Sequence, residues 1–312
     1  MQNINFDVPI LLIVFNRPDK TKKILDEISK IKPQKLYIAS DGPRVGNITD
    51  QILCHEVKLV IQDFILRNSC KVITLFRENN FGCKVAVSNA ITWFFENEDF
   101  GIILEDDTVP NNSFFKFCDE MLKKYYDNYS VGMICGSNLI ANSYKCRESY
   151  FFSKYTPVWG WATWKRAWNL YDVAIVGWNE SVLNNLKFAP KKKYKKKYWN
   201  HVFRNAYFGK IDTWDYQWTF TCWQNGMLSI IPAYNLVKNI GFDQTATHTI
   251  HSEPFFVKNS EPAELSFPLT HPLEIVLESQ TENLIEKVVY DLSFLSNVRN
   301  SILRTIKKYY GK

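Results

Sequence analysis

The alternation of short apolar runs with longer amphipathic stretches along the N-terminal part of the chain constrains the fold more than any other feature. Short apolar runs predict buried strands, and stretches with an apolar residue every three or four positions predict helices. Repeated β-α units predict an α/β fold with a mostly parallel sheet covered by helices on both faces. The expected strands cover residues 8–15, 35–40, 70–76 and 100–107, and the expected helices cover 17–31, 49–67, 84–97 and 111–126, the last capped at Asn112 or Ser113.

Polar residues follow each of the expected strands. Arg17 comes after the first strand, Asp41 after the second and Arg77 after the third, and the acidic residues 105–107 end the fourth. In such sheets ligands bind at the carboxyl ends of the strands, so these residues are expected at one edge. One cluster alone is typical of a solvated loop. Four clusters at one edge suit an anionic ligand that brings a divalent cation, such as a nucleotide diphosphate.

Glu105, Asp106 and Asp107 are adjacent carboxylates at the end of a buried strand. Like charges side by side raise each other's pKa unless something positive neutralises them. The candidates are a metal ion, a basic side chain or plain water. Mg²⁺ and Mn²⁺ prefer carboxylate oxygens and usually bridge one or two acids to phosphates. The chain contains no G-x-x-x-x-G-K-[ST] loop and no G-x-G-x-x-G motif, which excludes P-loop and Rossmann dinucleotide sites.

The 312-residue chain carries a net charge of +6, which is modestly basic. This charge suggests affinity for phosphate or lipid headgroups but lacks the density of a nucleic-acid binder, so no nucleic-acid partner is expected. The seven cysteines form no C-x-x-C pair, which argues against a disulfide framework or zinc knuckle and favours a reducing compartment. The apolar run 8–15 is too short to span a bilayer and no cleavage site follows it, so we expect a cytoplasmic protein.

Tryptophans crowd the second half of the chain between residues 150 and 223. Most of them are as consistent with core packing as with ligand binding, because Trp buries a large area. The sequence Trp159-Gly160-Trp161 lets the backbone approach closely between two flat faces, on which the apolar C–H faces of a sugar could stack. Asp212 and Asp215 lie in the same aromatic setting, where a partly desolvated carboxylate would be a competent general base.

An ordered set of segments carries a family resemblance: PILLIVFNRPDKTKKILDEI, ASDGP, RENNFGCKVAVSNAITWFF, GIILEDDTVPNNSFFKF, VWGWATWKRAW, TWDYQW and NIGFDQTATH. Over roughly residues 8–250 the chain resembles the bacterial nucleotide-diphospho-sugar transferases of the GT-A fold that are related to N-acetylglucosaminyltransferase I. The resemblance implies a GT-A-type sheet and a glycosyltransferase of the hexosyl or N-acetylhexosaminyl type. It also implies a Mn²⁺ or Mg²⁺ cofactor and a donor that is a nucleotide diphosphate sugar, a UDP-sugar by default.

The resemblance also assigns residues. Asp107 would bind the metal on the diphosphate, with His248 of a flap at 241–248 as a further contact to metal or diphosphate. Asp215 would be the base of an inverting reaction, with Asp212 as its competitor. The expected nucleotide-sugar-binding residues are Arg17, Asp41, Arg77, Lys84, Glu105 and Asp106, and the expected acceptor-binding residues are Trp159, Gly160, Trp161 and Trp214.

The expected organisation is a glycosyltransferase domain at 1–250, with a nucleotide-sugar half at 1–140 and an acceptor half at 141–250, followed by an extension at 251–312. From Leu292 to Lys312 apolar residues recur at helical spacing among basic ones, which predicts a helical tail. Such a helix could lie on the inner face of a membrane or pack on the domain. The acceptor would be a glycan or a lipid-linked sugar of a surface polysaccharide, such as lipopolysaccharide or capsule. A metal-dependent nucleotidyltransferase and a non-catalytic sugar-binding protein are the alternatives.

Overall fold

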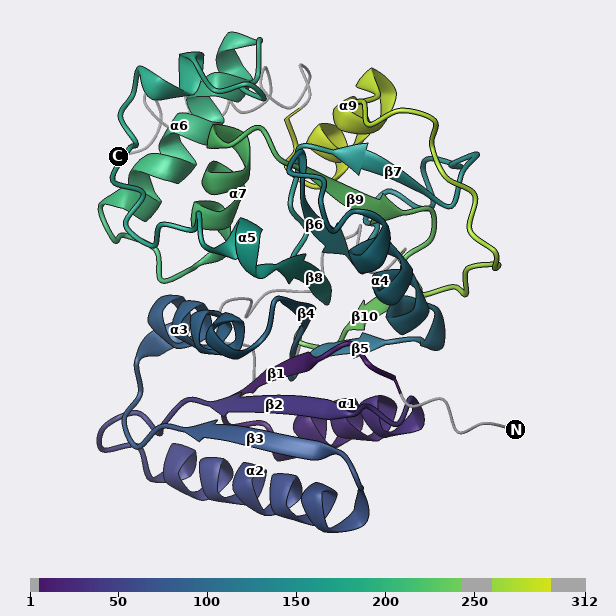
Figure 1. The fold of residues 1–312 in the computed structure, drawn as a ribbon. Helices are drawn as coiled ribbons and strands as arrows, with labels where there is room; N and C mark the ends of the chain where they lie inside the picture. Colours follow the sequence, from purple (N-terminus) through teal and green to yellow (C-terminus); the bar gives the residue numbers. More distant parts are fainter. Residues whose placement is uncertain (1–5, 243–259, 293–312) are drawn as a thin grey trace, which may run out of the picture.

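The computed structural model describes residues 6–242 and 260–292. Its centre is an eight-stranded sheet with the strand order β3-β2-β1-β4-β8-β6-β9-β7 (Figure 1). A second, two-stranded sheet pairs β5 with β10. The strands are β1 (Ile10–Val14), β2 (Lys35–Ser40), β3 (Lys71–Phe76), β4 (Phe100–Glu105), β5 (Thr108–Pro110), β6 (Val131–Cys135), β7 (Tyr150–Ser153), β8 (Trp161–Trp164), β9 (Leu228–Pro232) and β10 (Val237–Asn239).

The strand directions confirm the predicted α/β fold with a mostly parallel sheet. β1 pairs in parallel with β2 and with β4, β2 pairs in parallel with β3, and β6 pairs in parallel with β9. β8 lies between β4 and β6 and is antiparallel to both, so β6 runs in the same direction as β4. β7 is antiparallel to β9 at the edge of the sheet. Only β7 and β8 therefore oppose the common direction of this sheet.

Helices flank the sheet, and β1 is buried along its whole length, as expected of a strand covered on both faces. The predicted N-terminal helices are confirmed. The cap of α4 is a correction, because the side chain of Asn111, not Asn112 or Ser113, accepts the amide N–H of Phe114 where β5 ends and the helix begins. The helices are α1 (Pro18–Lys30), α2 (Ile48–Arg67), α3 (Gly82–Asn97), α4 (Asn112–Lys124), α5 (Lys165–Trp168), α6 (Lys193–Tyr207), α7 (Asp215–Gln224) and α9 (Ser279–Val288).

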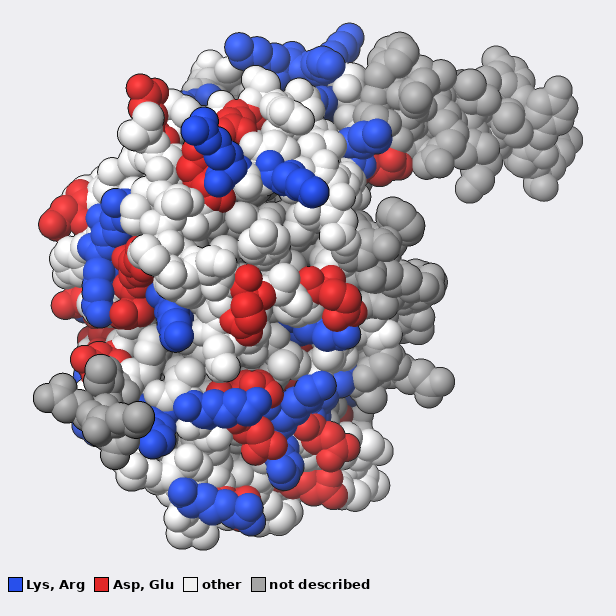
Figure 2. Space-filling view, turned by 90° about the vertical axis from the view of Figure 1, so that its right-hand side faces the viewer, with Lys and Arg blue, Asp and Glu red and all other residues white. Residues whose placement is uncertain are grey.

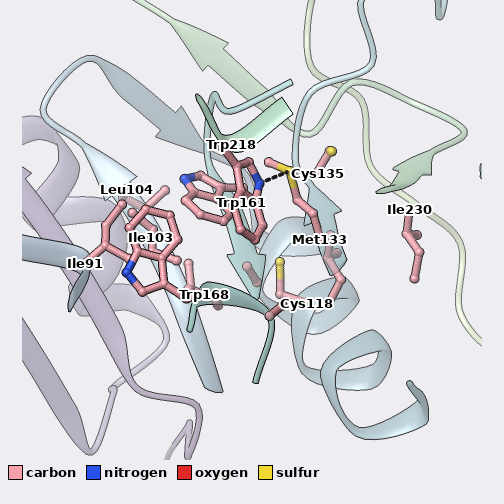
Figure 3. Close-up of a cluster of buried hydrophobic side chains, with 14 of the residues drawn as sticks. Ile91, Ile103, Leu104, Cys118, Met133, Cys135, Trp161, Trp168, Trp218 and Ile230 are labelled. Atoms are coloured by element: carbon pink, nitrogen blue, oxygen red, sulfur yellow. Dashed lines mark hydrogen bonds between the residues drawn. The ribbon is translucent and has the colours of Figure 1, made fainter. Parts of the chain in front are cut away.

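Several of the crowded tryptophans form the core around β8. Trp161, Trp168 and Trp218 pack on one another with ring centroids 5.4–6.2 Å apart. Figure 3 shows these three rings together beside β8, with the indole N–H of Trp218 donating to the sulfur of Met133 at 3.3 Å. Core packing therefore accounts for this part of the Trp-rich sequence.

Residues 260–292 return to the body of the molecule. Phe152 of β7 forms a bridge with Leu277, and the amide N–H of Ser149 donates to the carbonyl of Thr270 at 2.9 Å. Figure 1 shows α9 beside β7 and β9 at the end of the sheet opposite β3. The described part of the expected extension therefore packs on the sheet. The predicted tail helix lies, apart from Leu292, outside the described residues.

Basic and acidic side chains are interspersed over the lower half of the face in Figure 2. On that part of the surface, the charge forms no large field of one sign. Of the helices that lie within residues 6–242 and 260–292, none combines the length and the apolar character needed to cross a membrane.

Candidate active site

A tight turn at the end of β4 brings the three adjacent acids together. Thr108 closes this turn, because its hydroxyl accepts the amide N–H of Glu105 at 3.0 Å and donates to the Glu105 carbonyl at 2.9 Å. β5 then begins at Thr108 and pairs with β10. Asp106 and Asp107 are thus the turn residues between a strand of the main sheet and a strand of the small one.

Arg17 follows β1 and reaches the acids of the neighbouring strand. Its Nη1 lies 2.9 Å from Oδ1 of Asp106 and 3.0 Å from Oδ2 of Asp107. The amide N–H of Phe15 adds a longer contact of 3.3 Å to Asp106. We call Arg17, Glu105, Asp106 and Asp107 the acidic corner. A basic side chain, one of the three neutralising agents expected from the sequence, is therefore present.

One guanidinium does not balance three carboxylates. Burial raises the pKa of Glu105 to about 8, and the charges of Asp107 and Asp106 add to that rise. Burial also raises the pKa of Asp106 to about 6, against the opposing charge of Arg17. Burial and mutual repulsion therefore disfavour the ionised forms of Glu105 and Asp106, and a further cation would favour these ionised forms.

The chain that follows β10 closes against Asp107. The amide N–H of Ile240 donates to the Asp107 carbonyl at 2.8 Å. Gly241 comes so near that a Cβ on it would lie 2.4 Å from Oδ2 of Asp107, so a larger residue would displace the Asp107 side chain. His248 and the rest of the predicted flap beyond Phe242 lie outside the described residues.

Asp41 and Arg77 lie at the ends of the next two strands. The Asp41 carboxylate accepts the amide N–H of Phe81 at 3.0 and 3.1 Å and the side-chain amide of Asn80 at 2.9 Å. Burial raises the pKa of Asp41, opposed by the backbone amides of Phe81 and Gly42 and by the charge of Arg77. Arg77 donates to the carbonyl of Ala86 at 3.2 Å and lies over the Phe81 ring. Within the described chain, both side chains therefore organise the start of α3.

Asp212 holds the first turn of α3 from a distant part of the sequence. Its two carboxylate oxygens accept the amide N–H groups of Cys83 at 3.0 Å and of Lys84 at 2.9 Å. Gly82 has a φ of +76°, and a Cβ there would meet Oδ2 of Asp212 at 3.0 Å. Asp212 thus caps a helix N-terminus, where orphan amide donors and the helix dipole both favour a carboxylate.

Asp215 is the first residue of α7 and is held differently. The amide N–H of Tyr216 donates to its Oδ1 at 2.9 Å, and the hydroxyl of Thr213 donates to the same oxygen. The charge of Asp215 contributes to the raised pKa of Glu105 in the acidic corner. The pKa of the Cys83 thiol is raised first by burial and then by the charges of Glu105, Asp212 and Asp215. Asp215 therefore lies close to the acidic corner.

Asp215 also lines a cavity of about 280 Å³. Burial and then the charge of Asp215 raise the pKa of Tyr198 and of Tyr216, which lie in the same wall. The remaining lining residues are mostly apolar and come from the β6–β7 connection, the β7–β8 connection, α7, β9, α9 and the two residues that follow α9. They are Asn138, Leu139, Ile140, Thr156, Pro157, Val158, Trp159, Thr219, Ile231, Ile285, Val289 and Tyr290.

The four expected acceptor-binding residues take different positions. Trp159 lines the cavity and contacts Phe242 edge to face, with centroids 5.7 Å apart. Trp161 and Trp214 are only 1% and 3% exposed and stack on each other in the core at 5.5 Å. Gly160 has a φ of +58°, and its carbonyl accepts the amide N–H of Gly136 at 2.7 Å where β6 ends and β8 begins. Direct ligand contact is thus open to Trp159 among these four.

The sequence alone did not indicate the tyrosines beside Asp215. Tyr216 is its neighbour in the chain, and this adjacency is the one signal that could have found it. Tyr198 lies in the lysine-rich segment of α6, and Tyr290 lies beyond the segments that carry the family resemblance. Their meeting at one cavity depends on tertiary packing.

The acidic corner has oxygen ligands of the right chemistry for a divalent cation. Carboxylate oxygen is the ligand that Mg²⁺ and Mn²⁺ prefer, and Oδ1 of Asp107 accepts no hydrogen bond from any described residue. No three His, Cys, Asp or Glu side chains of the described chain are grouped to hold a metal by themselves. The corner therefore fits an ion that takes its other ligands from a diphosphate and water, which is how Mg²⁺ is usually bound.

No family model matches the chain, and no curated protein matches its sequence. Among solved structures it is similar to apo mouse xyloside xylosyltransferase 1, with 10% identity, a TM-score of 0.33, and coverage of 69% of this chain and 81% of that one. It is also similar to HddC from Yersinia pseudotuberculosis, with 10% identity, a TM-score of 0.30, and coverage of 51% and 77%. A third similar structure is 4-diphosphocytidyl-2C-methyl-D-erythritol synthase from Anaerococcus prevotii. It has 8% identity and a TM-score of 0.35, and the match covers 65% of this chain and 86% of that one. Likeness at this level assigns neither a ligand nor a reaction.

Proposed function

We propose that the chain is a glycosyltransferase that moves a sugar from a nucleotide diphosphate sugar to a hydroxyl of a glycan or glycolipid acceptor. One observation carries this proposal. Asp215 lies close enough to the acidic corner to raise the pKa of Glu105, and it also lines the cavity. A carboxylate between the acidic corner and an enclosed space is where a general base for transfer between two substrates would be needed.

In the proposed reaction, Asp215 accepts the proton of the acceptor hydroxyl as its oxygen attacks the anomeric carbon. The new bond forms on the face of the anomeric carbon opposite the diphosphate. The bond between the anomeric carbon and the diphosphate breaks, the diphosphate leaves with the electron pair, and the configuration inverts. Glu105 and Asp106 would face the donor at the acidic corner, and Asp107 would hold a Mn²⁺ or Mg²⁺ ion. When bound, this ion supplies Lewis-acid stabilisation of the departing diphosphate.

Asp41, Arg77 and Lys84 lie on the donor side in this proposal. We assign Asp41 and Arg77 a supporting part, since Asp41 contacts Phe81 and Arg77 contacts Ala86 at the start of α3. The backbone of Lys84 is held by Asp212, which leaves its ammonium group for the anionic donor. Arg17 acts on the donor through Asp106 and Asp107, to which it is paired.

The purified chain should hydrolyse a UDP-sugar slowly when no acceptor is present, and only with Mn²⁺ or Mg²⁺. Release of UDP and free sugar, followed by chromatography with and without a chelator, measures this. Pyrophosphate released from UTP and a sugar phosphate would instead indicate a nucleotidyltransferase. Binding of UDP-sugar with no turnover under any metal condition would indicate a sugar-binding protein.

Asp215→Asn should lower turnover by roughly 10²–10⁴-fold, the range lost when a positioned general base is removed. Donor binding, measured by calorimetry, should survive because the shape of the side chain is kept. Asp212→Asn is the matched control. It weakens the cap of α3, so it should lower the melting temperature and leave most of the turnover. The reverse pattern, with Asp212→Asn inactive and Asp215→Asn normal, would move the base to Asp212.

A further inference from the structure

The C-terminal segment supplies one wall of the cavity beside Asp215. Ile285 and Val289 are four residues apart and therefore lie on one face of α9, and both line the cavity together with Tyr290. These residues follow the part of the chain in which the family resemblance lies. We propose that α9 and Tyr290 complete the acceptor site and select an acceptor sugar that carries an apolar substituent, such as the methyl of an acetamido group. This inference rests on the proposed function.

Buried ion pairs fix α9 in place. Glu286 is 3% exposed and accepts hydrogen bonds from the ammonium of Lys195 in α6 and from the hydroxyl of Tyr155, the latter at 2.7 Å. Lys154 lies 3.3 Å from the same carboxylate. Burial raises the pKa of Glu286, but the hydrogen bonds from Lys195 and Tyr155 and the two lysine charges outweigh it, and the pKa is lowered. Glu286 is therefore held ionised between two lysines.

Glu282 makes a second attachment one turn earlier in α9. Its Oε1 accepts the hydroxyl of Ser153 at 2.6 Å, and its Oε2 lies 3.9 Å from Nζ of Lys154. We call Lys154, Lys195, Glu282 and Glu286 the α9 cluster. Because the cluster and the cavity-lining residues share one face of the helix, the cluster sets the position of the cavity wall. The position of this cavity wall is therefore fixed by buried contacts of the folded chain.

Three tyrosines place hydroxyl groups near Asp215. Tyr198 and Tyr216 line the cavity beside Tyr290, whose pKa is raised by burial first and then by the two other tyrosines and Asp215. No described residue forms a hydrogen bond with any of these three hydroxyls. In contrast, the hydroxyl of Tyr155 donates to Glu286. Unused hydroxyls around a carboxylate are suited to the hydroxyls of a sugar.

The apolar part of the wall selects the substituent. Leu139, Ile140, Val158, Ile285 and Val289 offer carbon surface with no polar group to satisfy. A cavity of about 280 Å³ is near the lower limit for small-molecule sites, so it suits one sugar ring with a small substituent. A methyl-bearing acceptor gains contact there, whereas an unsubstituted hydroxyl would be buried against carbon.

Ligand-observed NMR titration of the full chain tests the inference with two probes, methyl N-acetyl-β-D-glucosaminide and methyl β-D-glucoside. The acetamido probe should bind at least about 10-fold more tightly, as expected for apolar contact of this size. Val289→Phe, which fills the cavity, should abolish binding, and Tyr290→Phe, which removes only a hydroxyl, should weaken binding of both probes. Lys287→Phe, on the exposed face of α9, is the matched control and should bind as the unmodified chain does.

Equal affinity for the two probes, no binding of either, or unchanged binding in both cavity variants would overturn the inference. Melting curves confirm that each variant is folded, and Tyr290→Phe remains informative if Val289→Phe does not fold. Hydrolysis of UDP-sugar by the unmodified chain is measured alongside. Hydrolysis without the expected probe binding refutes only the acceptor site, whereas probe binding without turnover of any UDP-sugar refutes the glycosyltransferase.

Discussion

The acidic corner and the α9 cluster are both groups of buried charge, and they differ in balance. The acidic corner sets three carboxylates against one guanidinium, whereas the α9 cluster sets two glutamates against two lysines. An unbalanced group pays for desolvation and for repulsion between like charges, so it is expected where a ligand completes it. In the α9 cluster each glutamate lies within 3.9 Å of a lysine, and Oε2 of Glu282 accepts no hydrogen bond from a described residue. We therefore expect the acidic corner to bind a ligand and the α9 cluster to attach a helix.

Removing one partner from the balanced group should have the largest effect. Lys195→Met leaves Glu286 buried without its closest cation, which should cost about 3–5 kcal/mol of folding free energy. Urea denaturation measures this cost. Lys197→Met, an exposed lysine of the same helix, is the control and should change stability by less than about 0.5 kcal/mol. Equal stability of the two variants would contradict the structural role of the α9 cluster.

The regular parts of the fold followed from the sequence because their signals are local. The run 35–40 predicted β2, and the alternation of strand and helix predicted the parallel part of the sheet. The insertion of β8 between β4 and β6 was not predicted. Its pairing depends on contacts between residues far apart in the chain, such as Ile103 with Trp161, which no local pattern encodes.

The position of the acidic corner was easier to anticipate than that of the cavity. The acids at 105–107 follow a strand directly, so the rule about strand ends places them without knowledge of packing. Asp212 and Asp215 are three residues apart, and nothing in their spacing shows that one caps α3 while the other lines a cavity. That Tyr290 lines the cavity could not be predicted, because it depends on the return of the C-terminal segment to the sheet.

The second prediction concerns the response of the two groups to a cation. A Mn²⁺–UDP complex that binds as one ligand, at about 100 times its dissociation constant, should stabilise the unmodified chain by about 2.7 kcal/mol, because a ligand of the native state alone raises stability. Asp107→Ala should lose the metal-dependent part of this shift, measured as melting temperature with and without a chelator. Glu282→Gln is the control, and it should keep the full response. An undiminished shift in Asp107→Ala would mean that Asp107 does not bind the metal.

The last and smallest expected effect is a pH dependence that belongs to the α9 cluster. Burial raises the pKa of Glu282 from 4.5 to about 7, opposed by the hydroxyl of Ser153 and the charge of Lys154 and reinforced by the charge of Glu286. Between these two values the folded chain holds a proton that the unfolded chain has released, so this group makes stability fall as pH rises across that window.

The contribution of Glu282 should be about 1.4 kcal/mol for each pH unit between about 5 and 6. Glu286 contributes in the opposite sense and at lower pH, because its pKa is lowered. Glu282→Gln removes the titrating proton and keeps the hydrogen bond from Ser153, so its stability should fall less steeply over this range than that of the unmodified chain. Urea denaturation at half-unit steps of pH measures the difference in slope. Parallel curves would show that Glu282 titrates near its ordinary pKa and that the second attachment of α9 is an ordinary ion pair.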